Sequence, residues 1–280
     1  MSGSNASTHW IRSNYLPGVE LLSSTADPTR WRWFHETYSI CACEAADADW
    51  RYRHADHQLK DGSVMLLEPG EMHCTTRVRK PARFKVILFS PDTFTALSAD
   101  LGMPMAAHFR CAQVDSVELF NVVWRLGRAI EAGATALAQQ VLLAQTVRAV
   151  AEYAERAPGA PHAGREKKAV ERAKSYLQDR YQEPITLDQL SVAAGVSRFG
   201  LIRAFNRAVG MAPHAWQNLL RIERSRQLLM RGAPPISVAA EMGFYDQAHF
   251  TRHFKRIMRV TPTEYTRESA PSVPEYVLLP

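Results

Sequence analysis

The spacing of apolar positions changes along this chain, and the changes divide it into segments of different structure. Between Glu20 and Phe89, apolar residues come in short or alternating runs that are interrupted by turn residues. Such runs are typical of strands, and many short strands at this spacing favour a small barrel or sandwich. The strand-like runs are WRWFHETYSICAC, VMLLE and FKVILF, and the turn segments are DPT, EAADAD, LKDG, EPGE and RKP.

A helical period replaces this pattern between Asp115 and Ala157. Two apolar stripes with spacings of three and four residues predict two amphipathic helices, which meet near Gly133. The stripes are Leu119, Val123, Leu126 and Ile130, followed by Leu137, Val141 and Ala144. We expect these helices to pack beneath the barrel and to pair with a second subunit.

The segment APGAPHAG is rich in Pro and Gly and predicts a linker, after which the chain is helical until a Pro-interrupted tail. The sequence thus predicts an α+β protein, with a β-barrel and two helices followed by an all-α domain. The predicted divisions are a barrel at 1–114, a helical dimerisation segment at 115–157, a linker at 158–164, a helical domain at 165–267 and a tail at 268–280.

The predicted helical domain contains an internal repeat. Each copy predicts a helix, a Gly-containing turn and a second helix, which is the helix-turn-helix pattern. The first copy holds Phe205, Arg207, Gly210, Pro213 and Trp216, and the same frame recurs 49 residues later as Phe254, Arg256, Arg259, Pro262 and Tyr265.

Cap and turn residues support both helix-turn-helix units. Thr186 and Gln189 have the spacing of a capping box, and Gly195 and Gly243 stand at the two turns. A helix from Pro213 to Arg231 would join the units. Being rigid, it could hold two recognition helices about 34 Å apart, which is the spacing of successive major grooves.

The positive charge of the chain lies in the same domain. The formal net charge is +6, but residues 1–164 carry 16 Lys and Arg against 17 Asp and Glu, whereas residues 165–267 carry 18 against 9. Such an excess indicates a polyanionic partner, either nucleic acid or an acidic membrane surface. The repeat favours double-stranded DNA over a membrane, because its geometry suits the major groove.

Two segments of the domain resemble the AraC/XylS-type bacterial transcription regulators. They are LDQLSVAAGVSRFGLIRAF and GFYDQAHFTRHFKRIMRVTPTEY. Arg259 departs from the family pattern, which has Gly there, so the turn after the second recognition helix must accept a residue with a side chain. Pro235 and Ile236 are out of register with the family, which leaves the first helix of the second unit open.

The resemblance implies which side chains meet DNA. Those in base-facing places are Phe199, Ile202, Arg203, Gln247, Ala248, His249 and Arg252, and Asn206 lies on the same exposed face. We expect Arg203 and Arg252 to be the main readers, because a guanidinium can bridge O6 and N7 of guanine. The side chains expected at phosphates are Arg198, Arg207, Lys255 and Arg256. The alternative for each cation is a solvated basic face.

Residues 62–73, GSVMLLEPGEMH, resemble the second conserved stretch of the cupin barrel, which many regulators of this family use to bind an effector. In cupin enzymes the histidine in the place of His73 binds a metal together with an HxHxxxxE stretch. Here His54 and His57 have the wrong spacing and no matching Glu, so we expect no metal and no cofactor.

A barrel interior with apolar and aromatic walls and a few polar groups is a default pocket for a small molecule. The residues expected to line it are His73 and four that we expect to alternate along one strand, Trp31, Trp33, His35 and Tyr38. The alternative for these side chains is a packed core.

The predicted function is therefore a ligand-responsive, sequence-specific DNA-binding transcription regulator. We expect a cytoplasmic homodimer with a small-molecule effector, with RNA polymerase open as a further partner and with no membrane partner. The chain has no GxSxG, Walker, Rossmann or HExxH motif, so we expect no enzyme activity. The alternatives are a cupin-type metalloenzyme with an accessory helical domain, and an architectural DNA-binding protein with an inert barrel.

Overall fold

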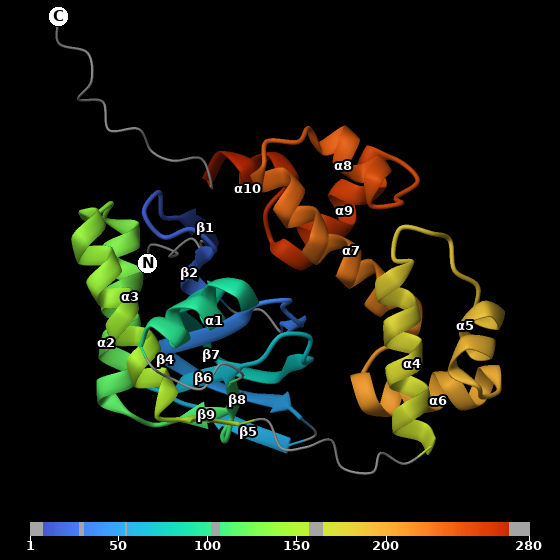
Figure 1. The fold of residues 1–280 in the computed structure, drawn as a ribbon, viewed down its shortest axis with the longest axis horizontal. Helices are drawn as coiled ribbons and strands as arrows, with labels where there is room; N and C mark the ends of the chain where they lie inside the picture. The colour runs from blue at the N-terminus through green and yellow to red at the C-terminus, as the bar shows by residue number, and fades with distance from the viewer. Residues whose placement is uncertain (1–7, 28–30, 54, 102–106, 157–164, 269–280) are drawn as a thin grey trace, which may run out of the picture.

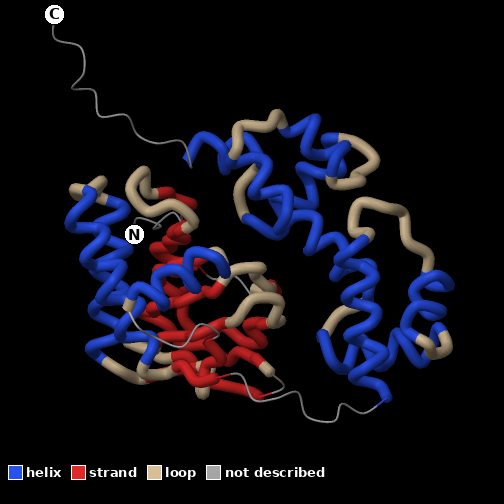
Figure 2. The backbone as a smooth tube through the Cα atoms, viewed as in Figure 1, coloured by secondary structure: helices blue, strands red, loops and turns tan. Residues whose placement is uncertain are grey.

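The structure is a computed structural model that describes residues 8–27, 31–53, 55–101, 107–156 and 165–268. Strands gather in the N-terminal part of the chain and the remainder is helical, as the α+β prediction requires (Figures 1 and 2). The described strands are β1 (Thr8–Arg12), β2 (Val19–Asp27), β3 (Arg32–Trp33), β4 (Tyr38–Tyr52), β5 (Ala55–Leu59), β6 (Val64–Leu67), β7 (His73–Phe89), β8 (Ala107–Phe109), β9 (Gln113–Val114) and β10 (Ala154–Arg156).

Within the described residues, eight strands form one antiparallel sheet, ordered β1-β2-β7-β4-β6-β9, with β3 on β7 and β5 on β4. The two longest strands, β4 and β7, pair over nearly their whole length with several register shifts. EAADAD and RKP therefore do not form the predicted turns. They lie inside β4 and β7, where bulges let polar and Pro-containing segments bend the strands without ending them.

Successive residues of β4 point to opposite faces of the sheet. Ile40 and Ala42 pack on the layer that contains the helices α2 (Val117–Glu131) and α3 (Ala136–Ala151), while Cys41 and Cys43 belong to the cluster on the other face. The two cysteines, which are two residues apart on one strand, therefore share a face, and their Sγ atoms are 3.7 Å apart.

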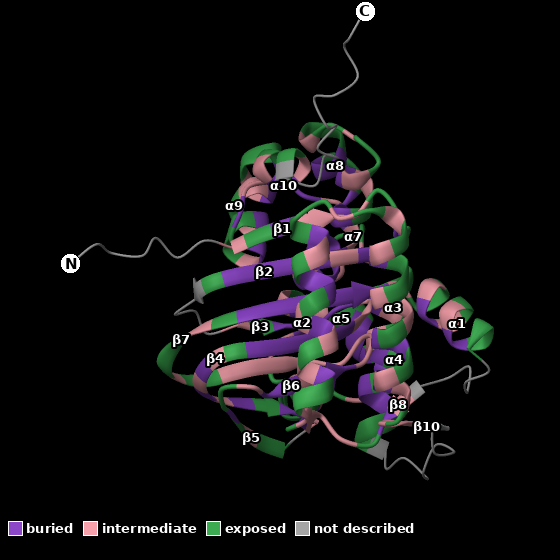
Figure 3. Cartoon of the chain, turned by 90° about the vertical axis from the view of Figure 1, so that its left-hand side faces the viewer, coloured by how far each residue is buried: buried purple, intermediate pink, exposed green. Residues whose placement is uncertain are grey.

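Two of the N-terminal helices, α2 and α3, lie across the sheet, with buried and exposed positions alternating along them (Figure 3). The predicted stripe of the first is confirmed, since its four residues are buried. The stripe predicted for the second is wrong: Leu137 is 71% exposed and Val141 46%, and Leu143, Val147 and Val150 face the core instead. A further helix, α1 (Pro91–Asp100), precedes them in the chain.

Helix α1 and strand β10 were among the elements of this region that the sequence did not predict. Ser90 accepts a hydrogen bond from the Thr93 amide and caps α1, whose first residue is a proline. Residues 154–156, predicted to be helical, form β10 and pair with β8. The predicted linker 158–164 and tail lie outside the described residues, apart from Glu268, which ends helix α10 (Pro262–Glu268). The domain boundaries stay a prediction.

The C-terminal helices begin and end where their caps require. The capping box of Thr186 and Gln189 is present, and Gly195 and Gly243 adopt φ of +69° and +71°. Arg259 adopts φ of +67°, so the turn accepts the residue that departs from the family pattern. The helices are α4 (Arg165–Asp179), α5 (Leu187–Ala194), α6 (Arg198–Val209), α7 (Pro213–Met230), α8 (Pro235–Glu241), α9 (Gln247–Met258) and α10 (Pro262–Glu268).

The question left open by Pro235 is resolved, because this proline occupies the first turn of α8, where its missing N–H costs nothing. In Figure 1, α7 runs between a group formed by α4, α5 and α6 and a group formed by α8, α9 and α10. None of the described helices combines the length and the apolar composition that crossing a bilayer requires.

Candidate nucleic-acid interface and ligand cavity

The two recognition helices, α6 and α9, each bury one face and expose the other. Leu201 and Phe205 of α6 and Phe250 and Phe254 of α9 are fully buried. Most of the predicted DNA-binding residues are exposed, namely Arg198, Phe199, Arg203, Asn206, Arg207, Gln247, Ala248, Arg252, Lys255 and Arg256, while Ile202 and His249 are partly buried. Phe199 is 78% exposed, so its ring has no role in the core of the chain.

The exposed arginines differ in their partners. Arg198 forms an ion pair with Asp188, and Arg207 lies 2.8 Å from Glu166. Exposed pairs of this kind contribute at most about 1 kcal/mol, so a phosphate could replace either carboxylate. Arg203 and Arg252 make no hydrogen bond or ion pair with any described residue. Their guanidinium groups are therefore available to an external partner.

His249 lies in an aromatic cluster at the start of α9. Its ring is 4.6 Å from that of His253 and 5.5 Å from that of Phe244, and its Nδ1 is buried without a partner among the described residues. Burial and nearby arginines, Arg256 first, lower the pKa of His253 to about 4. His249 thus packs at the edge of the exposed surface and is not freely presented on it.

One buried side chain ties the two units together, and the sequence analysis did not find it. Arg221 of α7 donates hydrogen bonds to the carbonyls of Tyr181, Gln182 and Glu183 in the first unit and to that of Gly243, 2.8 Å away, in the second. Because these carbonyls belong to different units, Arg221 holds the mutual orientation of α6 and α9.

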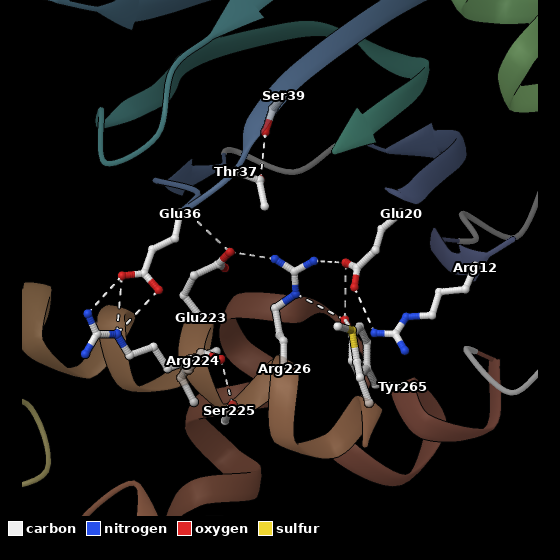
Figure 4. A network of polar contacts seen from close by, with 12 residues as sticks. Arg12, Glu20, Glu36, Thr37, Ser39, Glu223, Arg224, Ser225, Arg226 and Tyr265 are labelled. Atoms are coloured by element: carbon white, nitrogen blue, oxygen red, sulfur yellow. Dashed lines mark hydrogen bonds and ion pairs between the residues drawn. The ribbon is translucent and has the colours of Figure 1, made fainter. Parts of the chain in front are cut away.

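A second buried arginine lies between the helical part and the sheet (Figure 4). Arg226 of α7 donates to Glu223 at 2.7 Å, to the Tyr265 hydroxyl at 3.1 Å and, across the interface, to Glu20 of β2. Its guanidinium also lies 4.4 Å from the ring of Trp10. Glu223 is fully buried, and burial raises the pKa of its carboxyl group although Arg226 opposes this.

Two further contacts, which are more exposed than those of Arg226, also join the helical part to the sheet. Arg224 lies 3.2 Å from Glu36, and Arg32 donates to the carbonyl of Gly210, 2.7 Å away, at the end of α6. The sheet therefore contacts the end of the first recognition helix and the helix that joins the two units.

An apolar cavity of about 80 Å³ lies on the face of the sheet that carries Cys41 and Cys43. It brings together four of the five side chains predicted to line a pocket, Trp31, Trp33, His35 and His73. Other residues of its wall, which the sequence analysis did not name, include Leu22, Trp50, Met65, Leu67, Phe84 and Val86.

Tyr38, the fifth predicted lining residue, does not reach this cavity. Its ring stacks on Phe94 of α1 at 4.4 Å, on the other side of the sheet. The prediction is wrong because the run from 31 to 43 is not one strand: β3 ends at Trp33 and β4 begins at Tyr38, with an irregular segment between them.

Two stacked histidines form the polar end of the cavity. The rings of His35 and His73 are 5.2 Å apart. Burial lowers the pKa of His35 well below its ordinary value and that of His73 to about 4, so both rings are neutral at pH 7. No group of three or more His, Cys, Asp or Glu residues is placed to hold a metal ion in the described ranges.

Comparison with known proteins identifies both parts of the chain. Residues 16–147 match the AraC-like ligand binding domain family, and residues 190–268 match a helix-turn-helix domain family. The HTH-type transcriptional regulator MtrA of Neisseria gonorrhoeae is 34% identical over 91 residues, 32% of this chain and 30% of MtrA. YbfI of Bacillus subtilis, an uncharacterized HTH-type transcriptional regulator, is 36% identical over 74 residues, 26% of this chain and 27% of YbfI. The chain thus spans less than a third of the length of these relatives.

A solved structure shares the fold over most of the chain. Apo ToxT from Vibrio cholerae superimposes with a TM-score of 0.53 at 14% identity, covering 89% of this chain and 96% of ToxT. Another structure of ToxT, with a TM-score of 0.50, contains a bound unsaturated fatty acid.

Proposed function

The chain belongs to the AraC family of transcription regulators, since it carries both the ligand-binding and the helix-turn-helix domains of these proteins, and from this premise we propose that it is a ligand-responsive, sequence-specific DNA-binding regulator. The observation that carries the proposal is the pair of recognition helices in units that Arg221 joins, each helix with an exposed arginine that has no ion-pair or hydrogen-bond partner among the described residues. Two such helices suit successive major grooves of one duplex.

The exposed side chains have two roles in this proposal. Arg203 and Arg252 read guanine, Gln247 reads adenine, and the apolar Phe199, Ile202 and Ala248 contact thymine methyl groups. Phosphates are held by four cations, Arg198, Arg207, Lys255 and Arg256. Asn206 and His249 also belong to the proposed DNA-binding surface, where His249 packs beside the bases.

Footprinting tests the proposal directly. The DNA beside the gene for this chain should show a protected site of two half-sites about one helical turn apart. If no site is protected and the chain binds this DNA no more tightly than it binds random DNA, the sequence-specific function is refuted and an architectural binder is favoured.

Salt provides a quantitative test of the DNA contacts. If four phosphates are neutralised, affinity should fall roughly 100-fold between 50 and 200 mM salt, because bound cations displace counterions from DNA. Lys255→Ala should reduce the slope of log K against log salt by about 1. The measurement is a fluorescence-anisotropy titration at four salt concentrations, and a flat response would contradict the assignment of DNA as the partner.

We propose that the effector binds in the cavity of the sheet domain. The proposed division is an effector-binding domain at 1–114, a dimerisation segment at 115–157 and a DNA-binding domain at 165–267. An effector can change DNA affinity only by binding two arrangements of the chain unequally. The contacts of Arg226 with Glu20 and of Arg32 with Gly210 offer a direct route from the sheet to the recognition helices.

The exposed residues of α3 support a homodimer. Leu137 and Val141 are one helical turn apart and solvent-exposed, which is unfavourable for a helix in water unless a partner covers them. Leu137→Lys should convert a dimer to a monomer at micromolar concentration, as measured by sedimentation velocity. Arg128→Ala on α2 is the control, and a wild-type chain that sediments as a monomer would contradict this proposal.

The remaining parts of the proposal concern location and chemistry. We propose a cytoplasmic regulator without enzyme activity, which acts on transcription through DNA and, where it activates, through RNA polymerase. The alternative is a cupin-type metalloenzyme. Stoichiometric iron, nickel or zinc that is lost in His73→Ala would favour the enzyme.

A further inference from the structure

The wall of the cavity excludes a charged ligand. Among its described lining residues there is no Asp, Glu, Lys or Arg, and the two histidines are neutral. An ion moved from water into such a wall would lose its hydration without gaining a counter-charge, which is strongly unfavourable. An uncharged molecule with a large apolar surface suits the Trp, Leu, Phe and Val side chains of the wall.

The same wall leaves polar atoms unsatisfied. Trp33 Nε1, His35 Nδ1 and His73 Nδ1 are buried and have no hydrogen-bond partner in the described part of the chain. His73 also makes a backbone hydrogen bond with Glu71, and this leaves Nδ1 of the neutral ring as an acceptor. Because Trp33 Nε1 is a donor and His73 Nδ1 an acceptor, a ligand hydroxyl could satisfy either atom.

The size of the cavity requires one wall residue to move. A cavity of about 150 Å³ accommodates benzene, so the 80 Å³ present here is too small for a ring. Trp31 is only partly buried and precedes the short strand β3, so it can turn outward more easily than the buried wall residues. Its ring now stacks on Trp33, with 5.9 Å between centroids.

Trp31 also contacts the DNA-binding part of the chain. The guanidinium of Arg259 lies 5.5 Å from the centre of the Trp31 ring, in a cation–π contact. Arg259 is the residue that ends the second recognition helix, α9, in the left-handed conformation. Trp31 is therefore both a wall of the cavity and a support for the end of α9.

We propose that the cavity binds a small, uncharged aromatic or alicyclic molecule with one hydroxyl group, and that its ring enters by displacing Trp31 from Arg259. The inference rests on the proposed function, since it names the effector class of the same regulator and the contact through which binding reaches α9. It accounts together for the uncharged wall, the unsatisfied nitrogens and the side chain that departs from the family pattern at 259.

Three probes of one shape test the ligand class on the full chain by titration calorimetry: 4-methylphenol, toluene and 4-methylbenzoate. We expect 4-methylphenol to bind roughly two- to ten-fold more tightly than toluene, which lacks the hydroxyl. The carboxylate should bind at least about ten-fold more weakly than either. Equal or tighter binding of 4-methylbenzoate, or no binding of any probe at millimolar concentration, overturns the proposal.

Substitution of a lining residue locates the probe. Ala82→Phe places a ring in the cavity and should abolish binding of 4-methylphenol, while Ala82→Ser leaves the cavity open and should retain it. Unchanged affinity for DNA shows that Ala82→Phe is folded. Retained probe binding in that folded variant would place the probe elsewhere and overturn the assignment.

Arg259 variants test the displacement of Trp31. Arg259→Gly removes the cation and suits the positive φ, so 4-methylphenol should bind about two- to five-fold more tightly, because no cation–π contact has to be broken. Arg259→Lys keeps a cation over Trp31 and should behave as the wild type does. Equal affinity of the wild type and Arg259→Gly would overturn the displacement. If no probe binds while footprinting still finds a specific site, the ligand class fails and the proposed function stands.

Discussion

Replacing Arg252 with alanine should weaken binding to the specific DNA site by about 10- to 100-fold while leaving affinity for random DNA nearly unchanged. Arg252 is exposed on α9 and makes no hydrogen bond or ion pair with any described residue, so its removal costs the fold nothing. A bidentate contact with guanine discriminates among bases by roughly 1 to 3 kcal/mol, and this is the basis of the expected factor.

The control for Arg252→Ala is Lys255→Ala, one helical turn along the same exposed face. A phosphate contact has no sequence preference, so this variant should lose the same factor on specific and on random DNA. Arg203→Ala, at the matching position of α6, should behave as Arg252→Ala does. Equal losses on both kinds of DNA for Arg203→Ala and Arg252→Ala would make them phosphate contacts.

The largest loss of stability is expected from Arg226→Met. The side chain of Arg226 is 4% exposed, and those of its partners Glu20 and Glu223 are 12% and 3% exposed. Without the guanidinium, Glu223 remains buried with no counter-charge among the described residues and Glu20 keeps only Arg12, 2.9 Å away, and such a loss typically costs about 3 to 5 kcal/mol. Urea unfolding followed by circular dichroism should show a correspondingly lower midpoint.

Two further variants separate charge from packing at this position. The triple variant Arg226→Met, Glu20→Gln, Glu223→Gln should recover much of the lost free energy of unfolding, because it leaves no buried ion unpaired. Arg224→Met, whose pair with Glu36 is half-exposed, should change the free energy by about 1 kcal/mol or less. A loss of similar size in Arg224→Met and Arg226→Met would show that burial of charge is not the cause.

Most of the C-terminal part was predictable, because its signals are local. The capping box at Thr186, the glycines at the turns and the spacing of Phe205 and Phe254 all act within one or two helical turns. A repeat adds a second, independent copy of the same signals. The helix-turn-helix arrangement therefore follows from residues that are close in sequence.

The features that the sequence analysis missed depend on distant residues. Arg221 and Arg226 are ordinary cations in the sequence, and only the fold brings carbonyls and carboxylates around them. The face of α3 was predicted wrongly because its apolar residues, Leu137 and Val141 included, occur on more than one side of the helix. Tyr38 was placed wrongly because periodicity cannot reveal a break inside an aromatic run.

The ion pairs of Arg226 imply an order of events during synthesis. Arg226 and Glu20 are 206 residues apart in the chain, whereas Glu223 and Arg226 are one turn apart on α7. The sheet leaves the ribosome before α7, so we expect it to fold first, before Glu20 meets Arg226. When α7 forms, Glu223 neutralises Arg226 locally, so the arginine is already paired when the two parts dock. Docking of the helical part on the sheet then buries the preformed pair of Arg226 and Glu223 against the carboxylate of Glu20. This order avoids a folding intermediate with an isolated buried charge.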